Sequence, residues 1–480
     1  MAAKEHFIVI GGGPVGCTAA LFMSKLGHAV TLYEGRSDVP TDPEQSYPIG
    51  VNSRGLHALD DVAPCVSNAI RRGDNIVNSW EVYAGARRVA LLPSGVVHGT
   101  SRGQVNLGLW RACANDEGIS LRTNHRLRSI DFATKTLHFD VYDPCGGDDS
   151  TTTTTTPSSS VTIDASNSRV IGADGVNSVV RAAMQIADPD NFTVRITPWT
   201  NEYRVLFAEP GVMTEGLDPR VHYILGCGYA ATIENDARQQ WTLVTVARDT
   251  DDIVRGPARL VYARESTEAN VSSLREWISS SSPQFAPLVS DEECSRYFSR
   301  RTYRGAIVEC SKFHHDEWIV LLGDAAHSVL PPTGEGINSG LEDCEVLGKC
   351  VRDHPIASFS TYQRLRYPDI AGLWEYAYHL NRCPSFVGER IARTMFMIIE
   401  GMLHPSVSDS LFGALSAHRP SYSEIMIPWM RKRRVLMSAA RLLWYPIAGV
   451  WSLLMIPKTL LKFATRDNSA PKMKIVKSIV

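Results

Sequence analysis

The chain begins with the pattern that most constrains its fold. The apolar run His6–Ile10 leads into a glycine-rich turn, and residues 17–26 then have the composition of a helix. Gly11, Gly13 and Gly16 have the G-x-G-x-x-G spacing that is typical of a dinucleotide-binding turn. The first glycine permits the tight turn, the second lets the backbone approach a pyrophosphate, and the third lets the helix pack closely on the strand. The helix N-terminus then offers free N–H groups and a partial positive charge to the phosphates.

An acidic residue follows at the distance that such a turn requires. A second strand-like run, Val30–Tyr33, ends in Glu34, which lies 21 residues after Gly13. A carboxylate at this place accepts hydrogen bonds from ribose hydroxyls. The simpler alternative is a glycine turn that holds no ligand, and the strand, helix and acid together argue against it. The motif alone does not distinguish FAD from NAD.

Two later motifs repeat the same physical design. Asp174 follows a strand-like run within the pattern Ala-Asp-Gly-x-x-Ser-x-x-Arg. Another apolar strand ends in Gly-Asp at Asp324 and continues through a proline turn into a second glycine loop and a helix from about Asn338. Asp324 is placed to bind a ribitol or ribose hydroxyl. Gly334 and Gly336 keep side chains away from a flat ring, which the N-terminus of the following helix faces with its positive end.

This ordered set of motifs resembles the FAD-dependent aromatic hydroxylases, the class A flavoprotein monooxygenases. The resemblance implies that FAD is the cofactor, that Asp324 binds its ribitol, and that the Asp174 motif serves both FAD and NAD(P)H. It also implies that Arg102, in Ser101–Asn106, begins a helix and contacts the flavin nucleotide; outside such a set this arginine would be interpreted as a solvated surface charge. The expected cofactor-binding residues are Gly11, Gly13, Gly16, Glu34, Arg102, Asp174, Asp324, Gly334, Gly336, Ile337 and Asn338.

The resemblance also implies the domain organisation. We expect an α/β fold in which a Rossmann-like FAD-binding domain carries an inserted β-sheet substrate domain and a helical C-terminus. Three strand-like runs rich in β-forming residues support the inserted sheet: 203–207, 221–225 and 241–246. The expected segments are 1–82, 100–195 and 300–365 for the FAD-binding domain, 83–99 and 196–299 for the sheet domain, 366–435 for a helical cap and 436–480 for an apolar tail.

Within the family, the chain is similar to the kynurenine 3-monooxygenase branch in the runs Leu321–Cys344 and Phe359–Asp369. The positions that bind the substrate in that branch are not kept. The branch has an arginine where this chain has Ile76–Ser79, a tyrosine at Ser94, an asparagine at Ala377, and another tyrosine at the position of Phe412. A kynurenine carboxylate needs an arginine and hydroxyl donors. We therefore expect the scaffold and the chemistry of this branch with a less polar substrate.

The reaction implied by the resemblance is a monooxygenation of an aromatic or unsaturated small molecule. NAD(P)H reduces FAD, O2 adds at flavin C4a, and the hydroperoxide transfers one oxygen atom to the substrate. Candidate catalytic side chains are His327, Tyr376 and Tyr378, for each of which a purely structural role is the alternative. Two other functions remain open, namely an FAD-dependent reductase or dehydrogenase of a prenyl or polyene lipid, and a non-catalytic flavin-binding scaffold.

Composition excludes several other classes of protein. The formal net charge of −2 gives no general attraction for nucleic acid, so we expect no nucleic-acid partner. The ten cysteines are scattered without a C-x-x-C pair, which argues against a zinc site and a disulfide framework and for a reducing compartment. We expect no metal. The first apolar run is interrupted at once by glycine, so we expect no secretory signal.

Two segments depart from an ordinary globular sequence. The polar stretch from Asp149 to Ser160, with threonine at every position from 151 to 156, predicts a disordered hairpin insertion. Near the C-terminus, Leu442–Pro457 carries no charge and has basic residues on both sides. This segment is too short for a clean membrane span, and Pro446 interrupts it, so we expect it to lie on or dip into a membrane surface. A buried C-terminal helix is the alternative. The expected location is a membrane facing the cytoplasm, mitochondrial outer or endoplasmic reticulum, and otherwise the cytoplasm.

Overall fold

The computed structural model describes most of the chain. The described residues are 4–40, 48–73, 75–143, 156–213, 216–235, 238–248, 256–381, 411–435 and 437–438. The chain divides into two compact units. The first consists of Met1–Arg382 and His404–Ile427, and the second of Cys383–Leu403 and Pro428–Val480. Every feature described below lies in the first unit, unless stated otherwise.

A six-stranded sheet forms the centre of one half of the first unit, in the order β17-β18-β10-β1-β2-β6. Its strands are β1 (His6–Ile10), β2 (Ala29–Tyr33), β6 (Ile119–Arg122), β10 (Ser168–Gly172), β17 (His314–His315) and β18 (Ile319–Leu321). Neighbouring strands are parallel except for β17, which pairs antiparallel to β18. Strand β1 is almost continuously apolar and buried, as a central parallel strand covered on both faces requires. The predicted strands at 6–10 and 30–33 are confirmed.

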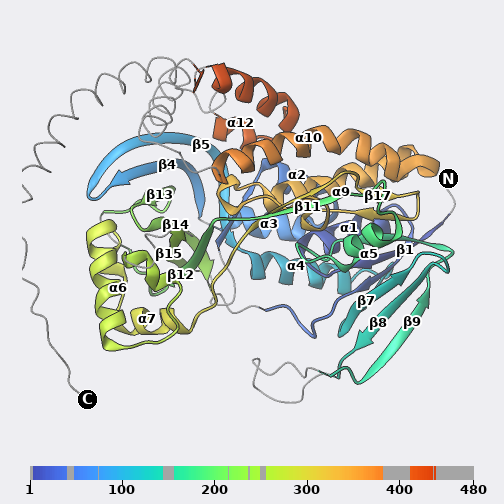
Figure 1. Ribbon diagram of the computed structural model, residues 1–480, viewed down its shortest axis with the longest axis horizontal. Helices are drawn as coiled ribbons and strands as arrows, with labels where there is room; N and C mark the ends of the chain where they lie inside the picture. The colour runs from blue at the N-terminus through green and yellow to red at the C-terminus, as the bar shows by residue number, and fades with distance from the viewer. Residues whose placement is uncertain are drawn as a thin grey trace, which may run out of the picture. The chain divides into compact units, whose positions relative to one another are not determined.

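Helices pack against this sheet and connect its strands (Figure 1). They are α1 (Pro14–Lys25), α4 (Arg102–Ala114), α5 (Val179–Ala187), α8 (Asp324–His327), α9 (Gly336–Asp353) and α10 (Ser358–Asn381). Helix α1 begins three residues before the predicted start, because Pro14 occupies its first turn, where a missing N–H costs nothing. Helix α9 begins at Gly336, two residues before the predicted Asn338. The predicted Rossmann-like domain is confirmed.

The second half is built on a seven-stranded sheet with the order β12-β15-β14-β13-β4-β5-β3. Its strands are β3 (Pro48–Asn52), β4 (Ile76–Ala84), β5 (Arg87–Ser101), β12 (Asn201–Phe207), β13 (Val221–Leu225), β14 (Gly228–Asn235) and β15 (Arg238–Arg248). The three predicted strands correspond to β12, β13 and β15. The sheet also includes β3 and β4, which the sequence had placed in the FAD-binding segment 1–82. They join it because β4 forms a long hairpin with β5 and pairs in parallel with β13.

The outer face of this sheet carries its own core. Helices α6 (Glu268–Ser281) and α7 (Asp291–Arg296) lie over β12 to β15, as Figure 1 shows. Trp241, Tyr297 and Phe285 are fully buried among aliphatic side chains of both layers. The described residues of this core come from the seven-stranded sheet and the helices over it, and none comes from the six-stranded parallel sheet. The sheet is therefore anchored by a hydrophobic core of its own.

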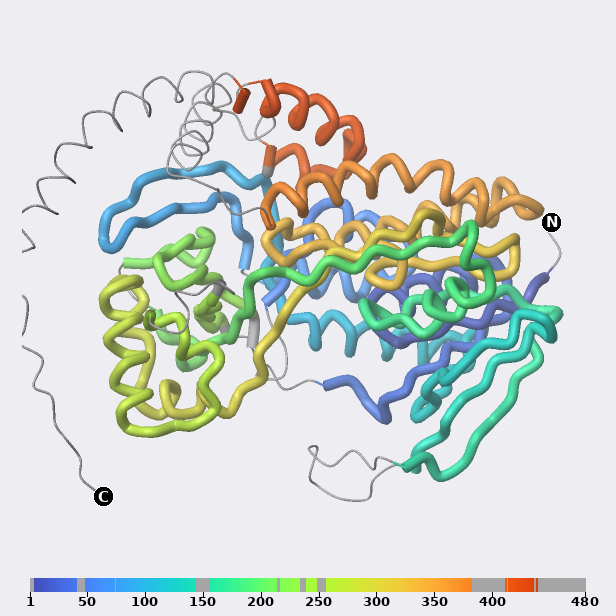
Figure 2. Tube along the Cα trace, in the orientation of Figure 1, coloured from blue at the N-terminus to red at the C-terminus, as the bar shows by residue number. Residues whose placement is uncertain are grey.

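Paired crossings join the two halves. Strands β11 (Val194–Pro198) and β16 (Ala306–Cys310) pair antiparallel, so the chain leaves the parallel domain and returns to it side by side (Figure 2). Helices α2 (Ser53–Val62) and α3 (Pro64–Arg72) follow β3, and the side chain of Asn52 caps the N-terminus of α2. Further along the chain, α12 (Leu411–Ser416) contacts β5.

A separate three-stranded sheet lies on either side of the segment that was predicted to be a disordered hairpin insertion. It consists of β7 (His125–Asp131), β8 (Thr136–Val141) and β9 (Ser159–Asp164), with Val141 opposite Ser159. The threonine-rich residues 144–155 connect β8 to β9 and lie outside the described residues. The predicted tail, 436–480, also lies outside them apart from residues 437 and 438. In the part of the chain that the structure describes, no helix is both long and apolar enough to cross a membrane.

Candidate functional site

The glycine turn after β1 is shaped by its neighbours. Gly11 has a φ of +103°, and a Cβ there would lie 2.5 Å from the carbonyl oxygen of Ala173. A Cβ on Gly16 would lie 1.8 Å from the carbonyl oxygen of Gly11. A Cβ on Gly13, by contrast, would meet only an Arg102 Nη atom at 4.0 Å. Gly11 and Gly16 are thus required because any side chain there would clash with the backbone. Gly13 instead leaves space above the N-terminus of α1 where a phosphate can approach.

Glu34 is held as a carboxylate beside this turn. Its Oε2 accepts a hydrogen bond from the Gly12 N–H at 2.7 Å, and its Oε1 accepts from the Arg36 backbone N–H at 3.0 Å and from Arg36 Nε at 2.9 Å. Burial opposes ionisation, but the bonds and charge of Arg36 outweigh it, so the pKa of Glu34 lies below its ordinary value. The ionised carboxylate is the acceptor that ribose hydroxyls require. Glu34 was predicted from the sequence, whereas Arg36 was not.

Two distant segments bring opposite charges to the same turn. Arg102 begins α4, as predicted, and its guanidinium is exposed near Gly13. Asp324 begins α8, and the preceding Gly323 lies close to Val15 in the first turn. Burial raises the pKa of Asp324, and the nearby Arg102 partly offsets this effect. Asp324 nevertheless remains accessible to solvent, so besides its hydrogen bond with Ser328 its carboxyl can accept one from a hydroxyl of a bound molecule.

The second glycine loop is open on the side of its missing side chains. Gly334 has a φ of +71°, and nothing lies within 4 Å of the place where its Cβ would be. At Gly336 only Val329 approaches, at 4.0 Å. Ile337 is half-buried. The loop therefore offers a bare surface at the N-terminus of α9, which fits a flat ring.

Asn338 has a structural task that the sequence did not show. Its Oδ1 accepts a hydrogen bond from the Asn52 N–H at 3.0 Å. Its Nδ2 donates to the carbonyl oxygens of Gly50 and Gly334, both at 3.0 Å. The side chain thus ties β3 of the large sheet to the glycine loop, which leaves the backbone of Asn338 for contact with a cofactor.

Asp174 also has a partner within the protein. Its Oδ2 accepts hydrogen bonds from the N–H groups of Val179 and Val180 at the start of α5. Its Oδ1 is buried and has no partner among the described residues. Burial raises the pKa of Asp174 above its ordinary value, and hydrogen bonds from Ser178 and from the backbone N–H groups of Val179 and Val180 offset only part of this effect. Asp174 lies against Gly11, so its unpaired oxygen adds an orphaned acceptor beside the first turn.

The candidate catalytic side chains occupy different environments. His327 is buried, and its Nε2 lies 2.5 Å from Asp343 Oδ2. Tyr376 is buried, whereas Tyr378 is half-exposed and hydrogen-bonds to Glu309 and to Thr197 Oγ1. The two tyrosines point to different sides of α10, as their spacing predicts. These partners favour structural roles for His327 and Tyr378.

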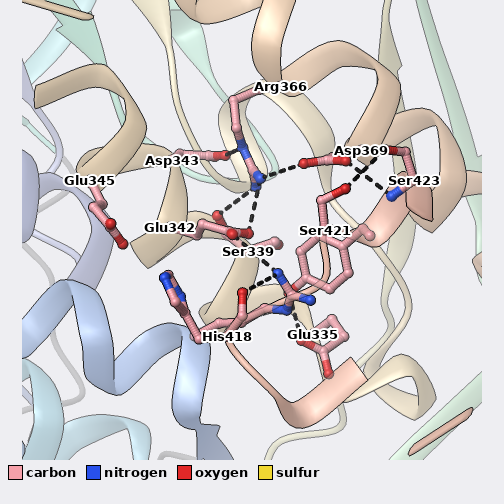
Figure 3. Close-up of polar contacts among 12 residues, drawn as sticks. Glu335, Ser339, Glu342, Asp343, Glu345, Arg366, Asp369, His418, Ser421 and Ser423 are labelled. Atoms are coloured by element: carbon pink, nitrogen blue, oxygen red, sulfur yellow. Dashed lines mark hydrogen bonds and ion pairs between the residues drawn. The ribbon is translucent and has the colours of Figure 1, made fainter. Parts of the chain in front are cut away.

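A buried ionic network fills the space behind the second glycine loop (Figure 3). Arg366 donates to Glu342 Oε2 and Asp343 Oδ1 at 2.9 Å each, and to Asp369 Oδ2 at 3.3 Å. Asp343 in turn accepts the Gly323 N–H at 2.9 Å. Carboxylates so close together require a cation between them, and Arg366 supplies it. The network thus fixes the Gly-Asp strand end relative to α9 and α10.

Arg54 extends the network to the C-terminal helices. It is fully buried, and it donates to Glu342 Oε1 at 3.1 Å, to the Leu415 carbonyl at 3.1 Å and to the His418 carbonyl at 3.3 Å. Its guanidinium lies 4.1 Å from the ring centroid of Tyr422. Both described arginines of the network therefore already donate hydrogen bonds to carboxylates and backbone carbonyls of the protein.

Glu335 lies where this network meets the glycine loop. It is flanked by Gly334 and Gly336, and its Oε2 accepts the Tyr422 hydroxyl at 2.7 Å. Asn52 Nδ2 lies 3.2 Å from both of its oxygens. Burial raises the pKa of Glu335 to about 7. Glu335 was not predicted from the sequence, although a charged side chain between the two glycines of a predicted cofactor loop is a signal that could have identified it.

One further cluster has the residue types of a metal site but not the geometry. His57, Glu345 and His418 lie together, with ring nitrogens and carboxylate oxygens within 4.8 Å of one another. The two imidazole rings are stacked at 3.8 Å with only 12° between their planes. Nearly parallel rings do not direct their lone pairs to one point, and Lys349 already pairs with Glu345. This geometry does not favour a shared ion.

The positions that differ from the kynurenine branch are also placed. Asn78 is exposed, and Ala377 is fully buried in α10. Ser94 is buried; its hydroxyl donates to the Gly95 carbonyl, and its own carbonyl accepts from Ser416 Oγ at 2.6 Å. The side chain of residue 412 lies outside the described residues. None of the described positions presents a cation.

Comparison with known proteins agrees with this geometry. Residues 5–352 match the family described as the FAD binding domain. The chain belongs to this family. FAD is therefore its cofactor, and the residues described above fit it, since Gly13, Gly334 and Gly336 leave open space beside Glu34, Arg102 and Asp324.

Two named relatives show the type of enzyme. Kynurenine 3-monooxygenase of Salinispora arenicola is 28% identical over 378 residues, which cover 76% of this chain and 77% of the relative. Kynurenine 3-monooxygenase of Aspergillus fumigatus is 27% identical over 370 residues, covering 73% and 69%. The chain is thus an enzyme of the FAD-dependent monooxygenase type.

Solved structures show the same fold. PqsL of Pseudomonas aeruginosa superposes with a TM-score of 0.59 at 17% identity, covering 79% of this chain and 96% of that one. A 2-methyl-3-hydroxypyridine-5-carboxylic acid oxygenase also gives a TM-score of 0.59, at 16% identity and with coverage of 79% and 91%. The expected aromatic-hydroxylase fold is confirmed.

Proposed function

We propose that this FAD-dependent monooxygenase takes electrons from NADPH or NADH and inserts one oxygen atom from O2 into an aromatic or unsaturated small molecule without a carboxylate. The observation that supports the substrate part is that the buried arginines beside the second glycine loop already pair with groups of the protein. Arg54 and Arg366 both lie near the second glycine loop, and both are used by Glu342, neighbouring carboxylates and backbone carbonyls.

A substrate carboxylate would therefore lack a partner and would face a carboxyl group. Glu335 lies in the glycine loop itself, and its ionised form repels an anion. A buried anion without a counter-charge costs several kcal/mol, on the order of 3–5. A neutral or cationic ring or polyene avoids this cost, and the buried Ala377 is consistent with an apolar wall.

The residues of the chain supply binding, orientation and a fixed electrostatic environment. When bound, FAD supplies the redox chemistry and the activation of O2. Glu34 accepts hydrogen bonds from ribose hydroxyls, while Arg102 and the N-terminus of α1 neutralise phosphate charge. Asp324 accepts a hydrogen bond from a hydroxyl near the first turn. The large sheet covers the substrate side and excludes water, which prevents loss of oxidising equivalents as peroxide.

The test begins with purified protein loaded with FAD. Flavin absorbance is followed under anaerobic conditions after addition of NADPH or NADH, with and without L-kynurenine, and oxygen uptake is then measured. We expect a reducible flavin whose rate of reduction does not respond to kynurenine. Kynurenine-stimulated reduction with formation of 3-hydroxykynurenine would overturn the substrate proposal.

A panel of neutral aromatic and polyene compounds extends the experiment. A compound that stimulates both reduction and oxygen uptake, and that appears as a product heavier by one oxygen atom from ¹⁸O2, supports the proposal. Saturation of a polyene double bond without oxygen uptake would instead establish the reductase. If neither NADPH nor NADH reduces the flavin under any of these conditions, the result would favour the non-catalytic flavin-binding scaffold.

A further inference from the structure

Glu335 combines three properties whose consequences go beyond the repulsion of an anionic substrate. It lies between the two open glycines of the loop, it is buried with 5% of its surface exposed, and it is a carboxyl group. Its hydrogen-bond partners come from other parts of the chain: the Tyr422 hydroxyl at 2.7 Å and Asn52 Nδ2 at 3.2 Å. A buried carboxyl without an arginine of its own changes its charge more easily than one in an ion pair.

The charged groups around Glu335 leave its ionisation closely balanced. Arg54, from α2, lowers its pKa, and Glu342, from α9, raises it. Arg54 is shared with Glu342, and Arg366 is occupied by Glu342, Asp343 and Asp369, so neither cation compensates Glu335 directly. Burial is the largest influence and brings the pKa to about 7, while the bonds from Tyr422 and Asn52 favour the ionised form.

We propose that Glu335 takes up one proton from solvent when FAD bound against the Gly334–Gly336 loop is reduced, so that the loop does not accumulate two neighbouring negative charges. Glu335 is in this sense a positioning residue for charge in the reductive step. The inference rests on the proposed placement of the flavin ring against this loop. It adds to the proposed function a definite proton stoichiometry.

The step is balanced in electrons and protons. Reduction of FAD by two electrons and one proton, delivered together as hydride from a nicotinamide, leaves one negative charge on the cofactor. The carboxylate of Glu335 then forms an O–H bond with a second proton from solvent. The driving force is Coulombic, because a new charge in a low-dielectric site raises the proton affinity of a nearby carboxylate. Tyr422 and Asn52 hold the carboxyl in place in both states.

The reduction potential of the bound flavin tests this inference without turnover. The FAD-loaded enzyme is reduced with xanthine and xanthine oxidase in the presence of a reference dye, between pH 6 and 9. Each proton taken up in a two-electron couple changes the potential by about 30 mV per pH unit. Above pH 7 we expect the potential of the wild type to fall more steeply with pH than that of Glu335→Gln. The difference in slope should be the value for one proton, about 30 mV per pH unit.

Two further variants make the assignment specific. Tyr422→Phe removes a hydrogen bond that favours the carboxylate, so the steep interval should begin at a higher pH. Glu345→Gln makes the same chemical change at a buried acid of α9, ten residues or about 15 Å further along the helix, and should leave the slope unchanged. Each variant is first checked for one FAD per chain by absorbance.

The outcomes separate clearly. Parallel plots for the wild type and Glu335→Gln would overturn the inference, and so would an equal loss of slope in Glu345→Gln. Because xanthine oxidase replaces the nicotinamide, the potential is measurable even if neither NADPH nor NADH reduces the flavin. In that case the proposed electron donor fails, while the slope still decides the role of Glu335.

Discussion

Replacement of Glu335 by glutamine should change how the stability of the protein depends on pH. Glutamine has nearly the same shape and can still accept hydrogen bonds from Tyr422 and Asn52, but it cannot ionise. In the folded protein, burial raises the pKa of Glu335 from its ordinary 4.5 to about 7. The folded state therefore keeps its proton to a higher pH than the unfolded state. The unfolding free energy of the wild type consequently falls as the pH rises from about 4.5 to about 7.

The size of the effect follows from the same two values. A tenfold change in proton affinity is worth about 1.4 kcal/mol, so the interval between 4.5 and about 7 corresponds to roughly 3 kcal/mol. Glu335→Gln lacks this loss. Relative to the wild type, the variant should therefore gain roughly 3 kcal/mol between pH 4 and pH 8. Whatever offset the amide introduces is independent of pH and cancels in this comparison.

Urea unfolding followed by tryptophan fluorescence measures this difference. Both proteins are studied at several values between pH 4 and pH 8 in a fixed excess of FAD, and FAD affinities measured in parallel remove any difference in binding. Glu345→Gln is a control of opposite sign: burial opposes ionisation of Glu345, but hydrogen bonds from Lys349 and His57 outweigh it and lower the pKa below the ordinary 4.5. This variant should therefore lose stability relative to the wild type only at the acidic end of the range, as the pH rises to about 4.5, and should stay parallel to the wild type above it. A stability difference between Glu335→Gln and the wild type that stays constant over the whole range would refute the reasoning.

Three further substitutions test the site and its support. Gly13→Ala should weaken FAD binding at least tenfold while leaving the unfolding temperature of the FAD-free chain unchanged, because its Cβ would meet only the end of the Arg102 side chain, at 4.0 Å; a fully loaded variant would show that no phosphate lies there. Gly16→Ala should instead destabilise the FAD-free chain, since its Cβ would lie 1.8 Å from a backbone oxygen. Arg366→Met should cost about 3–5 kcal/mol in urea unfolding, because it leaves buried carboxylates unpaired; a loss below about 1 kcal/mol would mean that water replaces the arginine.

The local sequence pattern was sufficient to predict the glycine turn that binds the cofactor. Gly11, Gly13 and Gly16 belong to one strand-turn-helix unit, and every contact that defines their spacing lies within a few residues or in the adjacent strand. The same holds for the start of α4 at Arg102 and for Asp324 at a strand end. Short-range sterics and the orientation of backbone N–H groups fix such units, so a sequence displays them directly.

The strands of the large sheet could be recognised, but their partners could not. The alternating runs in β12, β13 and β15 predicted strands, whereas nothing local shows that β4 pairs in parallel with β13, more than a hundred residues later. Strand order depends on which apolar faces find each other after collapse. The sequence boundary at residue 82 was therefore placed inside a hairpin that belongs to the sheet.

The sequence by itself determined that this chain binds FAD in a fold of the aromatic-hydroxylase type, because that information resides in contiguous motifs. Only the tertiary structure decided what surrounds the second glycine loop. Asn52 reaches Glu335 across 283 positions and Arg54 reaches Glu342 across 288. Buried charges find their partners by packing rather than by spacing in the chain. Whether an arginine is free to bind a substrate or is already used by the protein therefore becomes visible only when the chain is folded.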